Sequence, residues 1–178
     1  VGDQPDPGAP DAPPDSAWSL EPIAQDEPSG DNWLRVSLLD ADEDTGLLRL
    51  ALEAGHFDEV FGVALGLTFD PTLVSITEVR QPDDLPEPSG GAWGVLWRHE
   101  PGMMVAGLAV RRSADPIFGD APSPSVNLPE GTVLLEVDVQ VDAPGDLVFS
   151  FSRPDTAVVD TGYAAFEVET LGLSVRAR

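Results

Sequence analysis

Residues 60–79 read VFGVALGLTFDPTLVSITEV, and their pattern is the clearest structural signal in the chain. Apolar side chains occupy every second position of the first half: Val63, Leu65, Leu67 and Phe69. A period of two residues is typical of a β-strand with one face buried against a core. The other face carries Ala64, Gly66 and Thr68. Such small residues let another backbone or a second layer approach closely.

Asp70 and Pro71 end this strand, because proline has no backbone N–H to donate and restricts the residue before it. The chain then restarts at residue 73 as LVSITEV, which is rich in β-branched residues. Such residues favour a second strand. The stretch therefore predicts two strands joined at an Asp-Pro corner.

Short strands separated by Pro/Gly turns are predicted along the rest of the chain. The candidates are residues 32–39, 47–53, 92–99, 103–110, 133–141, 147–151 and 171–175, with shorter ones at 157–159 and 166–168. In residues 133–141 we expect Val133, Leu135, Val137, Val139 and Val141 to point inward and Glu136, Asp138 and Gln140 outward. No segment has a helical period. The prediction is an all-β, antiparallel jelly-roll β-sandwich of about eight or nine strands.

The first 31 residues differ in composition from the rest. They are rich in Pro, Asp, Gly and Ala, with Trp18, Leu20 and Ile23 as the apolar exceptions. Such a segment buries too little to offset its ordering entropy and favours an extended spacer. We expect an acidic, Pro-rich tail over residues 1–31 and a β-sandwich domain over residues 32–178. The three apolar residues either dock on the sandwich or a partner, or stay exposed.

Charge and composition exclude several classes of function. The chain has a formal net charge of −23, with 32 acidic residues against nine basic ones, all of them Arg. Such a chain repels nucleic acids and anionic membrane surfaces. Two explanations of the acidity remain open, adaptation to a salty habitat or a GC-rich genome with an acidic tail. Cysteine is absent, which excludes disulfides and thiol chemistry within the chain, and no apolar run is long enough to span a membrane.

An acidic turn at residues 40–46 is a candidate metal site. Asp40, Asp42 and Asp44 occupy the first three ligand positions of a calcium loop. A complete EF-hand loop would need Gly at its sixth position and Glu at its twelfth, where this chain has Thr45 and Ala51. A solvated hairpin turn is the competing interpretation. No other cofactor is expected.

Trp93, Trp97 and Arg98 are the candidate binding residues. Trp93 and Trp97 share one face of the predicted strand 92–99, where a flat aromatic pair can stack on sugar rings. The competing interpretation places at least one of the two tryptophans in the core. Arg98 lies on the opposite face with Gly94 and Leu96.

Three segments resemble the cohesin family of β-sandwich modules. They are the strand and Asp-Pro corner at residues 65–79, the strand after a Gly turn at residues 130–139, and the closing strand at residues 171–175. The resemblance spans about residues 33–178. It implies a non-catalytic module that binds dockerin modules through a sheet face. The long loops at residues 81–91 and 111–129 depart from the compact cohesin pattern. The acidic, Pro-rich start resembles the stalk that follows the lipidated cysteine of bacterial surface lipoproteins, which implies a lipid anchor upstream of Val1.

Three hypotheses of function follow from these observations. The leading one is an extracellular or surface-anchored protein-interaction module, whose partner is a dockerin-like protein or a neighbour in an extracellular assembly. The alternative is a carbohydrate-binding module that holds polysaccharide on an aromatic platform. An enzyme is the third, for which the sequence offers neither a cysteine nor a nucleophile-elbow pattern around its two histidines.

Overall fold

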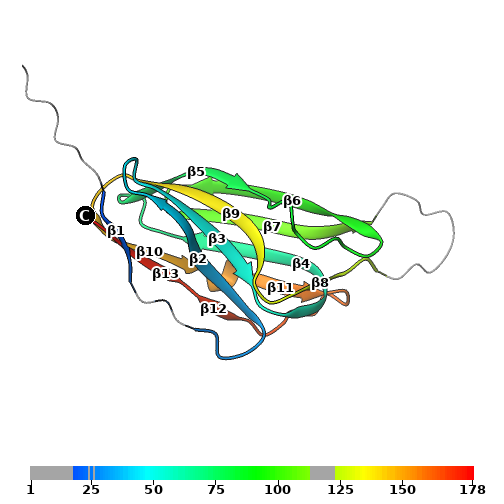
Figure 1. Ribbon diagram of the computed structural model, residues 1–178. Coiled ribbons are helices and arrows are strands. Elements are labelled where there is room, and N and C mark those ends of the chain that lie inside the picture. Colours follow the sequence, from blue (N-terminus) through cyan, green and yellow to red (C-terminus); the bar gives the residue numbers. More distant parts are fainter. Residues whose placement is uncertain (1–17, 24, 26, 113–122) are drawn as a thin grey trace, which may run out of the picture.

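The computed structural model describes residues 18–178 apart from residues 24, 26 and 113–122. The described chain consists of β-strands and one short 3₁₀ helix, η1 (Figure 1). In chain order the elements are β1 (Leu20–Pro22), β2 (Trp33–Asp42), β3 (Leu47–Ala54), β4 (Phe57–Thr68), β5 (Val74–Arg80), β6 (Gly91–Glu100), β7 (Met103–Arg112), β8 (Val126–Leu128), β9 (Thr132–Val141), β10 (Gly145–Phe151), η1 (Arg153–Asp155), β11 (Ala157–Asp160), β12 (Glu169–Leu171) and β13 (Leu173–Ala177). In this described part, no helix has the length and hydropathy needed to cross a membrane.

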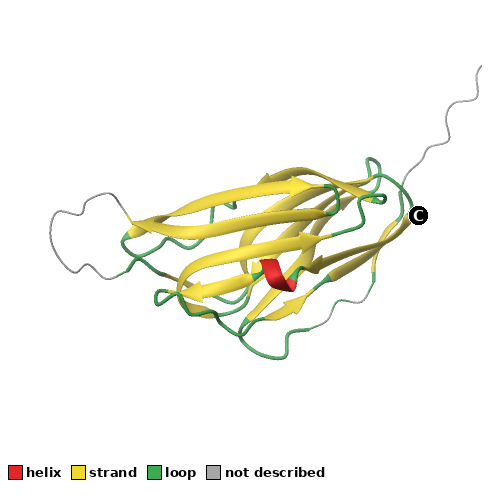
Figure 2. Cartoon of the chain, turned by 180° about the vertical axis from the view of Figure 1, so that it is seen from behind, coloured by secondary structure: helices red, strands yellow, loops and turns green. Residues whose placement is uncertain are grey.

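Two sheets enclose one apolar core, so the predicted all-β sandwich is confirmed (Figure 2). The larger sheet has the order β1-β13-β10-β4-β7-β6, and β11 and β8 also pair with β4. The smaller sheet has the order β12-β2-β3-β9-β5, with β12 parallel to β2. The described part of the chain has 13 strands, more than the eight or nine expected, and four of them are only three or four residues long. Three of these, β1, β8 and β12, were not expected because strands this short leave no period in the sequence, whereas β11 matches the short strand expected at residues 157–159.

Strand β4 crosses the larger sheet with the alternation that the sequence predicts. Val63, Leu65 and Leu67 are buried. On the opposite face, a Cβ atom at Gly66 would lie 2.6 Å from the Cβ of Asp155, so η1 packs directly on the backbone there. The expectation that small residues admit a second layer is therefore confirmed at Gly66.

The Asp-Pro corner joins β4 of the larger sheet to β5 of the smaller one. The Asp70 carboxylate accepts hydrogen bonds from the Thr72 hydroxyl at 2.6 Å and from the Thr72 amide at 2.8 Å. These bonds hold the pKa of Asp70 below its ordinary value. The corner is thus an Asp-stabilised turn, and the following strand begins at Val74, one residue later than expected.

A bulge in β9 changes part of the predicted alternation. Leu52 of β3 pairs with Leu135, and Glu53 pairs with Val133, so Leu134 is an extra residue in β9. Leu134 and Leu135 are both fully buried, whereas Val133 is only half-buried. The prediction that Val133 points into the core as Leu135 does was wrong, because a bulge leaves no mark in the hydrophobic pattern.

Asp138 points outward, as the sequence predicts, yet its side chain is buried. It lies on the outer face of the smaller sheet, between Arg49 of β3 and Arg80 of β5. Arg80 donates to its two carboxylate oxygens at 2.8 and 2.9 Å, and Arg49 donates at 3.1 Å. The hydrogen bond from Arg80 is the largest cause of the lowered pKa of Asp138; burial opposes it, and the hydrogen bond from Arg49 adds to the lowering. The predicted outward direction is confirmed, and the side chain is buried because arginines on both neighbouring strands cover this carboxylate.

Part of the acidic N-terminal segment belongs to the sandwich. Strand β1 pairs with β13, and the Leu20 side chain is 6% exposed (Figure 1). Trp18 lies over Gly46, where a Cβ atom would be 2.6 Å from the indole nitrogen. Of the three apolar exceptions in this segment, Leu20 therefore docks on the core and Trp18 packs against it.

Two other expected boundaries were wrong. The expected loop at residues 111–129 contains β8. Near the C-terminus, the strand is Glu169–Leu171 rather than residues 166–168. Phe166 instead packs edge-on against Phe57, with ring centroids 5.3 Å apart.

Candidate functional site

The outer face of the larger sheet carries mostly small side chains over part of three neighbouring strands. The register of β4, β7 and β6 aligns Gly and Ala residues, together with Leu96, in two adjacent rows. One row contains Gly62, Ala109 and Gly94, and the next contains Ala64, Gly107 and Leu96. Backbone therefore forms most of this surface, and a partner can approach it closely.

Side chains around this floor enclose a groove of about 410 Å³. It is lined by Phe61, Gly62, Val63, Ala64, Gly94, Leu96, Gly107, Leu108, Ala109, Arg111, Ala157, Val159 and Tyr163. Leu96 is 73% exposed and Tyr163 is 74% exposed. Contiguous apolar groups of this kind mark interaction surfaces more often than isolated exposed side chains do. We call this feature the outer groove.

Tyr163 forms one wall of the outer groove in a strained conformation. Its φ angle is +63°, which is uncommon for a residue other than glycine. The turn is held by Asp160, whose carboxylate accepts hydrogen bonds from the amides of Gly162 and Ala164. The ring packs edge-on against Phe61 with centroids 5.1 Å apart. Strain at an exposed aromatic residue is a feature that clusters at binding sites.

Arg111 forms the opposite end of the outer groove. Its guanidinium group lies across Gly94, where a Cβ atom would come within 2.0 Å of the Arg111 Nε atom. Any larger residue at position 94 would displace this side chain. Gly94 of β6, which has no side chain, therefore leaves the space that the Arg111 guanidinium group occupies.

Of the predicted binding residues, Trp93 belongs to the core region. It is half-buried, packs against the core cluster, and donates its indole N–H to the Pro86 carbonyl at 2.7 Å. The loop at residues 81–90 thus covers this ring. The competing interpretation, that at least one of the two tryptophans is a core residue, holds for Trp93.

Trp97 and Arg98 reach the surface on opposite faces of β6. Trp97 is 45% exposed and stacks on His99, with centroids 6.0 Å apart and ring planes at 19°. Arg98 lies on the outer face and lines a depression with Glu100 and Asp155. The structure therefore does not bring Trp93, Trp97 and Arg98 together into one site.

The acidic turn is held by its own hydrogen bonds. Asp42 accepts hydrogen bonds from the Thr45 hydroxyl at 2.7 Å and from the amides of Asp44 and Thr45. These bonds lower the pKa of Asp42, with the Thr45 hydroxyl as the largest cause. Asp40 accepts from the amide of Ala41. Within the described residues, no three carboxylate or histidine groups, these included, are arranged to hold a metal ion.

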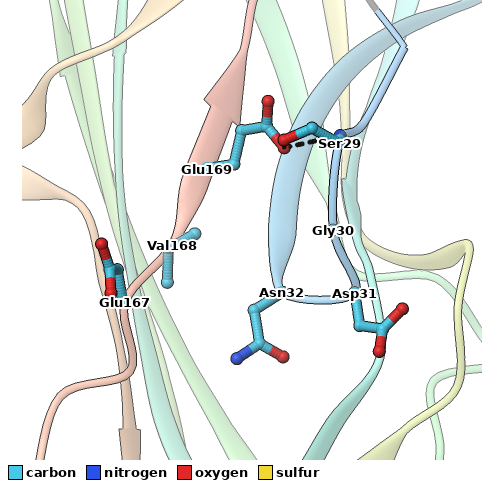
Figure 3. Close-up of a pocket in the computed structure, with 7 residues that line it drawn as sticks. All are labelled: Ser29, Gly30, Asp31, Asn32, Glu167, Val168 and Glu169. Carbon is cyan, nitrogen blue, oxygen red and sulfur yellow. Dashed lines mark hydrogen bonds between the residues drawn. The ribbon is translucent and has the colours of Figure 1, made fainter.

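A polar depression of about 620 Å³ lies where the N-terminal segment meets β12 (Figure 3). The Glu169 carboxylate accepts hydrogen bonds from the Ser29 amide at 2.8 Å and from its hydroxyl at 3.0 Å. Asp31 and Glu167 also line the depression, with no hydrogen bond between their side chains in Figure 3. The Ser29–Glu169 contact fastens the N-terminal segment to the sandwich.

The outer groove was not predicted from the sequence as a site. Gly94, Leu96 and Arg98 were placed on one face, with Arg98 as a candidate binding residue, and the small residues of β4 were expected to admit a second layer, but the two sets were not joined into one site. Small residues at alternate positions of 62–66, 94 and 107–109 were the available signal. Their convergence depends on the pairing of β4 with β7 and of β7 with β6, which the sequence does not reveal.

Comparison with solved structures identifies the fold as that of cohesin modules. The non-cellulosomal cohesin of the hyperthermophilic archaeon Archaeoglobus fulgidus is 14% identical, with a TM-score of 0.55 over 80% of this chain and 88% of that one. The sixth cohesin of scaffoldin B from Acetivibrio cellulolyticus, solved in complex with a dockerin, is 9% identical, with a TM-score of 0.55 over 80% and 96%. A type I cohesin–dockerin complex from Clostridium thermocellum gives 11% identity and a TM-score of 0.52 over 83% and 94%.

The chain therefore has a cohesin-like β-sandwich, as its sequence resemblance predicts. At these levels of identity the similarity concerns the fold. No family model matches the sequence, and no curated protein matches it.

Proposed function

We propose that this chain is a non-catalytic protein-interaction module that binds a protein partner on the outer face of β4, β7 and β6. The observation that carries the proposal is the outer groove, where Leu96 stands largely exposed beside a floor of glycine and alanine. Because the floor consists of Gly and Ala, its backbone lies close to the surface, and a partner can pack closely against it. Burying it would stabilise a complex through the hydrophobic effect.

The comparisons support a dockerin-like partner. Two of the similar structures are cohesins solved with dockerins, and they cover most of the sandwich. A neighbour in an extracellular assembly is the other form of the same proposal. Both forms use one exposed sheet face to bind another protein.

We place the module outside the cell or at the cell surface. The acidic, Pro-rich composition of the first residues supports a spacer between the sandwich and an anchor. A lipid on a cysteine upstream of Val1 would supply that anchor. Fractionation of the source organism, followed by detection of the protein in the envelope or the medium, tests this location.

Paired capture experiments test the proposed face. The bait is the full chain, and the retained proteins from the secreted and envelope fraction of the source organism are identified by mass spectrometry. We expect Leu96→Glu to abolish capture of a discrete protein that the unmodified chain retains, because a charge at the centre of an interface costs at least about tenfold in affinity. Leu39→Glu is the matched control, since Leu39 is 46% exposed on β2 of the smaller sheet.

The two variants separate the outcomes. Capture that survives Leu96→Glu but not Leu39→Glu would move the interface to the smaller sheet. Capture by both variants at the level of the unmodified chain would exclude the outer groove as the docking surface.

Trp97 supports carbohydrate binding as a second candidate function. Its exposed ring lies nearly parallel to His99, which gives a flat aromatic surface at the edge strand β6. Affinity electrophoresis in polysaccharide gels tests this candidate. Retardation that Trp97→Ala abolishes without lowering the thermal midpoint would favour it over the protein-binding proposal.

A further inference from the structure

The outer groove differs in charge from the rest of the molecule. The chain carries 32 acidic residues, yet none of the described residues that line this groove is Asp or Glu. Arg111 is the one charged residue in that lining. The groove is therefore a locally basic, apolar site on a strongly acidic protein.

Arg111 also differs from the arginines that stabilise the fold. Among the described residues, Arg35, Arg49, Arg80 and Arg176 form ion pairs with carboxylates of the sandwich. For Arg111, by contrast, the described part of the chain supplies no carboxylate within ion-pair distance and no side-chain hydrogen bond. Its guanidinium group instead lies across Gly94 at the end of the groove.

A partner that covers this groove removes water from the Arg111 guanidinium. A buried cation without a counter-charge is costly, so a neutral or basic partner would lose affinity there. A carboxylate would instead accept paired, charge-assisted hydrogen bonds from the planar guanidinium group. Charge complementarity therefore selects an acidic partner surface at this point.

We propose that the outer groove takes a protein segment that inserts one apolar side chain between Leu96 and Tyr163 and presents an adjacent carboxylate to Arg111. The inference rests on the proposed function and adds the chemistry of the partner. Arg98 lies on the same face of β6, four residues from Gly94 and so about 14 Å along the strand. A second acidic residue of the partner can pair there.

The net charge of −23 does not exclude such a partner. At physiological ionic strength charges are screened beyond about 8 Å, so distant carboxylates act weakly on a docked segment. The charge closest to a segment docked in the groove is that of Arg111, the charged residue in its described lining. Long-range repulsion lowers the association rate, whereas the local pair slows dissociation.

Three immobilised synthetic peptides test the inference against the full-length chain. Each has 12 residues and the same central Leu-Phe pair, flanked on both sides by Glu, by Gln or by Lys. We expect the Glu peptide to bind at least about fivefold more tightly than the Gln peptide and the Lys peptide to bind most weakly. Arg111→Ala should remove the preference for Glu over Gln, and Gly94→Val should do the same by displacing the guanidinium group.

Arg178→Ala is the matched control, because it removes the same charge at the last residue of the chain, outside the groove lining. Equal binding of all three peptides, abolished by Leu96→Glu, would overturn the carboxylate preference and leave the proposed docking face standing. Binding of none of them would overturn both. A second copy of this chain is another occupant that the groove could take. Analytical ultracentrifugation of the protein alone tests it, because a dimer that Leu96→Glu dissociates would overturn the inference.

Discussion

At the residue scale, Asp138 shows how a strongly acidic chain uses its few arginines. Its side chain is 8% exposed and lies between Arg49 and Arg80, whose side chains are 43% and 29% exposed. We expect Asp138→Asn to lower the free energy of unfolding at pH 7 by about 1–2 kcal/mol, because charge-assisted hydrogen bonds are lost. Urea denaturation followed by tryptophan fluorescence measures this change. Glu130→Gln is the control, since Glu130 is exposed and removing its charge breaks no hydrogen bond that the structure shows.

The lowered pKa of Asp138 also sets the direction in which the free energy of unfolding changes with pH. The folded-state pKa of Asp138 lies below the value of about 4 that it has when unfolded. Its contribution to stability is therefore complete above about pH 4 and is lost as the pH falls through the folded-state pKa. The difference between the unmodified chain and Asp138→Asn should close in acid. A difference that persists unchanged to pH 2 would contradict this account.

The burial of Asp138 also shows what the sequence leaves open. Its alternation with buried valines correctly directs it away from the core. Its burial depends on which strands flank β9, and Arg49 and Arg80 lie 89 and 58 residues away in the chain. No local pattern contains that information.

At the scale of elements, β1 closes one side of the larger sheet. It pairs with β13, and flanking backbone bonds from Ser19 to Arg178 and from Ile23 to Ser174 extend the contact. We expect a chain that begins at residue 32 to be less stable by about 2–4 kcal/mol than one that begins at residue 18, because Leu20 loses its burial and β13 loses its partner. Urea denaturation compares the two chains. Equal midpoints would show that β1 contributes nothing to the sandwich.

The truncated chain should also aggregate, since β13 would become an open edge with unpaired backbone groups. Light scattering during refolding detects this effect.

The sequence predicts the long strands and the Asp-Pro corner well because their periods span many residues. It misses β1, β8 and β12 because each has only three residues. Pro22 within β1 fits its place at the edge of the sheet.

At the scale of the whole molecule, the outer groove exists only because the sheet is assembled. Its lining comes from β4, β6, β7, β11 and the turn at Tyr163, which are spread over about 100 residues of the sequence. The resemblance to cohesins predicted a sheet face as the binding surface, without indicating which residues form it. Composition predicted the acidic character of the chain, but not that the described lining of one groove would contain no acidic residue.

The same net charge makes the whole fold sensitive to ionic strength. With 32 acidic residues against nine arginines, repulsion outweighs the ion pairs, and it is stronger in the compact state than in the unfolded one. The Debye length falls from about 30 Å at 0.01 M salt to about 8 Å at 0.15 M and 3 Å at 1 M. We therefore expect the thermal midpoint to rise steeply with NaCl up to about 0.2 M and then to level off. A rise confined to molar salt would indicate ion exclusion rather than screening, and a fall would show that the ion pairs of Arg35, Arg49, Arg80 and Arg176 dominate.

Repeating the titration with micromolar CaCl₂ and with a chelator gives the matched test of the acidic turn, because a divalent ion bound by Asp40, Asp42 and Asp44 would raise the thermal midpoint at concentrations too low to screen.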